Sequence, residues 1–162
     1  MLKWIVAVLG GGVVGGAIGF AAGIFVYPYI FLADIVATEV VQGAETKQAV
    51  ATGGFIHADP SDPIHYGSGG LTLYDDLLHL ESDFEVGPGP KFHVYLVPSD
   101  QVSSNADVED SMFVDLGRLK AFKGSQNYPV PAGVSLSNYG SVVIWCEQFG
   151  VLISPAKLDF GA

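Results

Sequence analysis

An uninterrupted apolar run from Trp4 to Ala33 constrains the fold of this chain more than any other feature, because its 30 residues include no charged side chain. As an α-helix the run would extend about 45 Å at 1.5 Å per residue, which exceeds the roughly 30 Å hydrocarbon core of a bilayer. A secretory signal has an apolar region of only about 7–15 residues, closely followed by a cleavage site. We therefore expect an uncleaved transmembrane anchor over residues 1–33, with a cleaved signal peptide as the alternative.

Charged residues flank the apolar run unequally. Lys3 precedes it, whereas the acidic residues Asp34, Glu39 and Glu45 follow it. Positively charged flanks tend to stay in the cytoplasm, so the sequence predicts a single-pass protein of the cytoplasmic membrane with its N-terminus inside. The rest of the chain would then lie on the periplasmic or extracellular side, and Pro28 would end or kink the helix near that surface.

Glycines recur every four residues within the predicted anchor, at Gly11, Gly15, Gly19 and Gly23. Three overlapping GxxxG pairs of this kind form a groove on one helix face, where another backbone can approach closely. The alternative is that glycine is simply common in membrane helices. We expect helix packing through this row, with either a transmembrane helix of a larger complex or a second copy of the chain as partner.

The remainder of the chain divides into a short stalk and a β-domain. Residues 34–48 are mixed in character and only weakly periodic, and we interpret them as a juxtamembrane stalk. Over residues 49–162, short apolar runs alternate with turns rich in Gly, Pro, Asp and Ser, which predicts an all-β antiparallel sandwich or small barrel after one N-terminal transmembrane helix. The expected strands are Val50–His57, Gly70–Tyr74, Leu77–Glu81, Lys91–Val97, Phe113–Phe122, Ser141–Cys146, Gly150–Ile153 and Ala156–Phe160.

The charge balance excludes one class of partner. The formal net charge is -10, and 14 acidic residues face 5 basic ones from residue 49 onward. Such a surface repels a phosphate backbone, so nucleic acid binding is not expected. A cationic partner or a divalent metal ion is compatible with this charge, although a surface that is acidic only for solubility is the favoured interpretation.

The chain contains a single cysteine, Cys146, at the end of the apolar run Ser141–Cys146. It cannot form an intramolecular disulfide, and neither a c-type haem attachment motif nor a resolving cysteine for dithiol exchange is present. A lone thiol in an oxidising compartment is either buried or retained for chemistry. Free cysteine is among the most buried residue types, so structural burial beside Trp145 and a redox role both remain open.

Several motifs resemble the DM-thirteen domain, a small all-β family proposed to act in electron transfer. The resemblance covers about residues 49–159, and it departs near the end, where Ile153, Ser154 and Pro155 replace the usual Phe-Gly pair. The matching segments are Gly54-Phe55, Asp59-Pro60, His65 with Gly67, Gly69 and Gly70, Gly87-Pro88, Val94-Tyr95-Leu96, Leu116-Gly117, Leu119-Lys120, the Gly124-Ser125-Gln126-Asn127-Tyr128 stretch, Pro131, Leu136-Ser137, Tyr139, Ser141–Cys146 and Phe149.

The resemblance implies that the family cysteine, here Cys146, acts as a bare thiol or as a ligand of a haem-like group. His65 and His57 are the imidazoles of the family motif that could join it, although no spacing argument places them there. The cofactor is thus either a haem-like group or none. Thiolates are soft ligands that suit haem iron or copper, and burial and hydrogen bonding set the potential.

A second group of candidate ligands lies in one proline-bounded loop. His57, Asp59, Asp62 and His65 could together bind a divalent ion, or the aspartates could simply cap turns. His79 and His93 are each interpreted as satisfied surface or core histidines. No nucleophile elbow, phosphate loop or metalloprotease helix occurs, so no catalytic residue is expected.

Two functional hypotheses follow from the sequence. In the first, the β-domain outside the membrane is an accessory or interaction subunit of a membrane complex, such as a respiratory or photosynthetic one. In the second, it is an electron-transfer module that uses Cys146 as a thiol or as a cofactor ligand. We expect the protein to be non-enzymatic under the first hypothesis.

Overall fold

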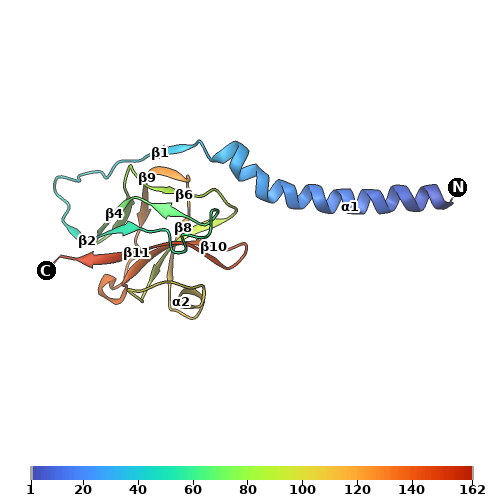
Figure 1. Cartoon of the computed structure of the whole chain (residues 1–162). Helices are drawn as coiled ribbons and strands as arrows, with labels where there is room; N and C mark the ends of the chain where they lie inside the picture. The colour runs from blue at the N-terminus through green and yellow to red at the C-terminus, as the bar shows by residue number, and fades with distance from the viewer. Residues whose placement is uncertain (1, 162) are drawn as a thin grey trace.

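The computed structural model describes residues 2–161 and consists of one long helix followed by a β-domain (Figure 1). The helical elements are α1 (Leu2–Tyr27), η1 (Pro28–Leu32), α2 (Ala106–Glu109) and η2 (Leu136–Asn138). The strands are β1 (Val36–Thr38), β2 (Ala49–Phe55), β3 (Gly67–Ser68), β4 (Gly70–Tyr74), β5 (Leu77–Leu80), β6 (Glu85–Val86), β7 (Phe92–Val97), β8 (Val114–Arg118), β9 (Lys123–Pro129), β10 (Ser141–Cys146) and β11 (Val151–Phe160).

The helix α1 extends away from the β-domain as an isolated rod (Figure 1). The segment Lys3–Leu32 has a mean hydropathy of 2.1, and none of its most apolar window is buried, so it is long and apolar enough to cross a membrane. At Pro28 the helix changes to the wider π-helical turn η1, because proline has no N–H to continue the α-helical hydrogen bonds. The expected change in the helix at Pro28 is therefore confirmed.

The eleven strands form one sheet with the order β3-β6-β9-β5-β4-β2-β11-β10-β7-β8, to which β1 adds beside β9. All pairs are antiparallel except β1 with β9. The sheet folds over a single large core that includes Leu78, Leu80, Phe84 and Ile144. The predicted all-β antiparallel class is confirmed.

A smaller core lies on the opposite face of β7 and β10, under α2. It contains Trp145 and Tyr95 together with Val108 of α2. Successive side chains of a strand point to opposite faces, so Trp145 joins this small core while Cys146 joins the large one. Trp145 and Cys146, which are adjacent in the family motif, therefore pack in different cores.

The segment interpreted as a stalk contributes a strand to the sheet. β1 lies parallel to β9, with Val36 opposite Lys123 and Thr38 opposite Ser125. Beyond the strand, Glu39 binds Lys120 through both carboxylate oxygens, at 2.9 and 2.8 Å. The chain between α1 and the main body of the domain is thus hydrogen-bonded to the sheet along β1.

Several other boundaries differ from the sequence-based expectation: β3 and β6 were not predicted, the ends of β2, β5 and β7 shift by one or two residues, and two longer segments are divided differently. The strand expected at Phe113–Phe122 ends at Arg118, and a separate strand, β9, begins at Lys123. The two final strands are one, because β11 continues through Pro155. Pro155 lies opposite Val143 of β10 and just beyond the pairing of β11 with β2, which begins at Ala156. Proline is tolerated there since the Ile56 carbonyl oxygen accepts a hydrogen bond from the Ser154 hydroxyl.

Candidate functional site

Cys146 lies at the end of β10, opposite Phe92 of β7 and Val151 of β11. The residue is only 2% exposed and belongs to the large core. Its Sγ donates a hydrogen bond to the carbonyl oxygen of Pro90 at 3.3 Å. Burial raises the pKa of the thiol, although the backbone N–H groups of Phe149 and Gln148 partly oppose this shift. The structure therefore favours the protonated thiol, which is a poor nucleophile and a poor ligand.

A haem-like group does not fit at Cys146 in this structure. A thiolate ligand must face an open volume, whereas this sulfur faces the Pro90 carbonyl and is enclosed by core side chains. Neither His57 nor His65 has a described contact with Cys146, because both imidazoles bind Asp62 instead. The three candidates implied by the family resemblance are thus not brought together among the described contacts.

Asp62 organises the loop that carries the predicted metal candidates. Its Oδ1 accepts hydrogen bonds from the N–H groups of Ile64 and His65, and its Oδ2 accepts one from Nδ1 of His65 at 2.6 Å. The side-chain bond from His65 is the main cause that lowers the pKa of Asp62 to about 2. Nε2 of His57 donates to the Asp62 carbonyl oxygen at 2.8 Å.

The neighbouring Asp59 accepts hydrogen bonds from both the N–H and the hydroxyl of Ser61. Aspartates that accept bonds from backbone groups two or three residues ahead form Asx turns. This geometry matches the interpretation in which the two aspartates cap turns rather than bind a divalent ion. The oxygens of Asp59 and Asp62 are used to shape the loop, and these residues do not form a converging ligand set with His57.

A different group of potential ligands converges on the outer face of β7, β8 and β10. Among the described residues, one ligand atom from each of His93, Asp115 and Glu147 lies within 4.8 Å of the others. Nδ1 of His93 donates to Asp115 at 3.0 Å, and its Nε2 lies 3.5 Å from Glu147. Glu147 also accepts a hydrogen bond from the Tyr95 hydroxyl and binds Lys91 at 2.8 Å. A divalent ion would have to displace Lys91, so the group as it stands is a satisfied polar network.

Sequence reasoning treated His93 singly and did not find this network. Its three members come from different parts of the chain, and only the register of the strands brings them together. His93 lies opposite Trp145 of β10, which is two residues before Glu147. Tyr95, two residues after His93 on the same strand, lies opposite Asp115 of β8. His79 has its own partner, because its Nδ1 lies 2.6 Å from the side-chain oxygen of Asn127.

The glycine row of α1 makes no close contact with any other part of the described residues. A Cβ added at Gly11, Gly15, Gly19 or Gly23 would meet nothing within 4 Å. The row is therefore open to a helix from another chain. Gly19 and Gly23 also form part of the wall of a cavity of about 660 Å³ between α1 and the β-domain.

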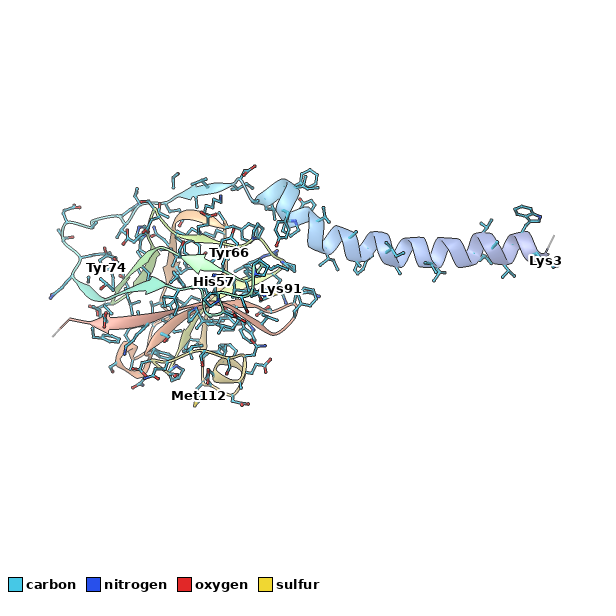
Figure 2. All side chains as sticks on the ribbon, viewed as in Figure 1. Lys3, His57, Tyr66, Tyr74, Lys91 and Met112 are labelled. Atoms are coloured by element: carbon cyan, nitrogen blue, oxygen red, sulfur yellow. The ribbon has the colours of Figure 1, made fainter. Side chains whose placement is uncertain are left out.

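This cavity approaches the family cysteine from the helix side. Its domain wall is formed by Gly89, Pro90, Lys91, Arg118 and Gln148. Pro90 is the residue whose carbonyl accepts the hydrogen bond from Cys146. Figure 2 shows Lys91 on the side of the domain from which α1 extends. The thiol thus lies beneath the helix-facing end of the domain, separated from the cavity by Pro90.

The Gly-Ser-Gln stretch of the family motif has a structural role. The side chain of Gln126 is fully buried in β9. Its Oε1 accepts hydrogen bonds from the N–H groups of Lys120 and Ala121 and from the Tyr128 hydroxyl. Its Nε2 donates to the Ala121 carbonyl at 2.8 Å. Gln126 therefore secures the turn between β8 and β9.

The fold defines a compact antiparallel β-module on a helix that could span a membrane. The sequence of residues 61–158, more than half of the chain, matches the family described as electron transfer DM13, and the chain belongs to this family. Membership makes the β-domain an electron-transfer-related module. Comparison with curated proteins and with solved structures gives no significant match.

Proposed function

We propose that the chain is a membrane-tethered accessory subunit of an electron-transfer complex. In this role, α1 packs against another transmembrane helix, and the DM13 domain binds a neighbouring subunit outside the membrane. The open glycine row carries the proposal, since four glycines on one helix face have no partner within the described part of this chain. The packed, protonated state of Cys146 is consistent with a subunit that supports electron transfer without reacting itself.

Co-purification of the full chain from its native membranes tests the helix contact. Gly15→Leu places a bulky side chain on the glycine face, and partner subunits are expected to be lost. Ala17→Leu is the matched control, because Ala17 is a small residue two positions along the helix, close to the opposite face. Equal recovery of partners with both variants would contradict the proposed contact. Self-association of the purified chain would identify a second copy as the partner.

The proposed location is the cytoplasmic membrane, with the N-terminus inside and the domain on the periplasmic or extracellular side. The buried Cys146 makes this orientation simple to test, since an introduced cysteine becomes the only readily labelled thiol. Ser104→Cys lies at an exposed position far along the chain from α1. A maleimide that cannot cross membranes should label this variant in intact cells. Labelling only after the cells are broken would contradict the orientation.

A second candidate function is favoured by one observation, the position of Cys146 behind Pro90 at the helix-facing end of the domain. In this alternative, Cys146 takes part in electron transfer between the domain and a redox group in the membrane. It requires that Cys146→Ser abolish electron transfer by the assembled complex. A Cys146→Ser protein with full activity would leave only the accessory role.

A further inference from the structure

The cavity between α1 and the domain is amphipathic. On the helix side its wall is apolar and includes Gly19, Phe20, Gly23 and Ile24. On the domain side it carries the cationic side chains of Lys91 and Arg118. A ligand that matches both halves has a hydrocarbon part and an anionic part.

Arg118 is the cation that is available for such a ligand. It is the only arginine of the chain, and its side chain is exposed. Within residues 2–161 Arg118 has no ion-pair partner, whereas each lysine of the stalk and domain is paired. The lysine pairs are Lys47–Asp76, Lys91–Glu147, Lys120–Glu39, Lys123–Glu85 and Lys157–Asp100. An unpaired guanidinium is unusual on a protein of net charge -10, because acidic partners are plentiful.

The length of α1 places this cavity at the membrane surface. Counting from Trp4, about 20 helical residues cross the roughly 30 Å hydrocarbon core, which reaches Ile24. Gly19 and Phe20 then lie within the hydrocarbon, while Tyr27 and Pro28 lie among the lipid headgroups. The same cavity is lined by Tyr27 and Pro28 on the helix and by Lys91 and Arg118 on the domain.

We propose that the cavity binds one anionic phospholipid, such as phosphatidylglycerol. The lipid phosphate pairs with the guanidinium of Arg118, whose planar fork of N–H groups matches phosphate oxygens. Lys91 is already shared with Glu147, so Arg118 provides most of the headgroup selectivity. The start of an acyl chain packs against Phe20 and fills the space beside Gly19 and Gly23, at the domain end of the glycine row, which leaves Gly11 and Gly15 for the proposed helix contact. The inference rests on the proposed tether, because only an inserted α1 brings the cavity to the lipid headgroups.

Lipid retention by the full chain tests the proposal. The protein is extracted in mild detergent, mixed with equal amounts of phosphatidylglycerol and phosphatidylcholine, and examined by native mass spectrometry. We expect one phosphatidylglycerol to be retained preferentially. Arg118→Gln should weaken its binding by about tenfold, the lower limit for losing a hydrogen bond to a charged group. Lys157→Gln is the control, since it removes the same charge from an exposed residue outside the cavity wall.

A steric variant tests the apolar half separately. Gly23→Leu would occupy the cavity, and loss of the bound lipid is expected without any change of charge. Equal effects of Arg118→Gln and Lys157→Gln would overturn the proposal, as would equal retention of the two lipids. Retention of a neutral quinone or of a second chain in place of the lipid would likewise overturn it.

Extraction of native membranes with alkaline carbonate distinguishes the lipid site from the tether. If the chain is released by carbonate, the tether is wrong and the lipid site falls with it. If the chain stays inserted but shows no preference for phosphatidylglycerol, the lipid site alone is wrong. Thermal unfolding of Arg118→Gln should match that of the unmodified protein, because the exposed side chain has no described partner to lose.

Discussion

The thiol of Cys146 donates its hydrogen to the carbonyl oxygen of Pro90 at 3.3 Å. This contact joins the last residue of β10 to the loop that precedes β7. It gives the sulfur a partner inside the protein and places it under the domain wall that faces α1. The family cysteine is therefore both enclosed and close to the end of the domain from which α1 extends.

Cys146 should react with Ellman's reagent roughly hundredfold or more slowly in the folded protein than after unfolding, because burial limits access and raises the pKa of the thiol. The rate of absorbance change at neutral pH measures this protection. Ser104→Cys provides an exposed thiol in the same chain and should react rapidly. Fast reaction of the unmodified folded protein would contradict the buried assignment.

Gln126→Leu should lower the free energy of unfolding by at least about 3 kcal/mol, because it leaves several buried backbone groups and the Tyr128 hydroxyl without partners. Urea denaturation followed by fluorescence measures the loss. Gln101→Leu changes an exposed glutamine in the same way and should alter stability little. Similar midpoints for the two variants would show that the Gln126 network is not stabilising.

Alanine substitutions at Gly124 and Gly133 distinguish the stability cost of backbone strain from that of a steric collision. Both have positive φ angles, 84° and 89°, but only at Gly124 would a Cβ collide with the Ala37 carbonyl of β1. Gly133→Ala should cost about 1 kcal/mol from strain alone. Gly124→Ala should cost about 3 kcal/mol or more, since it also forces β1 away from β9. Equal losses in thermal or urea unfolding would argue against the close approach of β1.

The Glu39 carboxylate predicts a pH dependence for the pairing of β1. Partial burial alone would raise its pKa, but hydrogen bonds from Lys120 and from the Asn127 N–H outweigh burial and hold the pKa below its ordinary value of 4.5. A lowered folded-state pKa means that the stabilisation is complete above pH 4.5 and is lost as the pH falls through the folded value. The amide proton shift of Asn127 in the full chain should titrate with a midpoint below 4.5.

Two variants serve as controls for this titration. Glu39→Gln should abolish the titration of the Asn127 amide, because no ionisable group then accepts its hydrogen bond. Lys120→Gln should move the midpoint upward, since it removes the second donor to the carboxylate. A midpoint at or above 4.5 in the unmodified protein would contradict the described contact.

The strands that sequence reasoning predicted best are those with continuous or alternating apolar residues. Gly70–Tyr74 and Ser141–Cys146 have the same bounds in the structure as in the prediction. β9 was missed because it begins with polar residues and Gly124, which is typical of a turn. The buried position of Gln126 is satisfied by hydrogen bonds rather than by apolar contact, and a hydropathy pattern does not register such a residue.

The arrangement around the family cysteine was only partly predictable. Burial of Cys146 follows from its apolar strand, and the turn-forming role of Asp59 and Asp62 was one of two interpretations of their loop. The His93 network and the cavity beside α1 depend on strand register and on the direction in which the helix leaves the domain. Local periodicity reveals neither the strand register nor the direction of the helix, so the network and the cavity could be found only in the structure.

The parallel pairing of β1 with β9 has a mechanical consequence. Only a few residues separate the end of η1 from β1, and β1 is hydrogen-bonded to the sheet. The domain is therefore joined to its helix by a short, hydrogen-bonded connection rather than by a flexible linker. A rotation of α1 about its own axis would therefore turn the domain with it, and in the proposed membrane assembly the helix contact would also set which face of the domain meets the next protein.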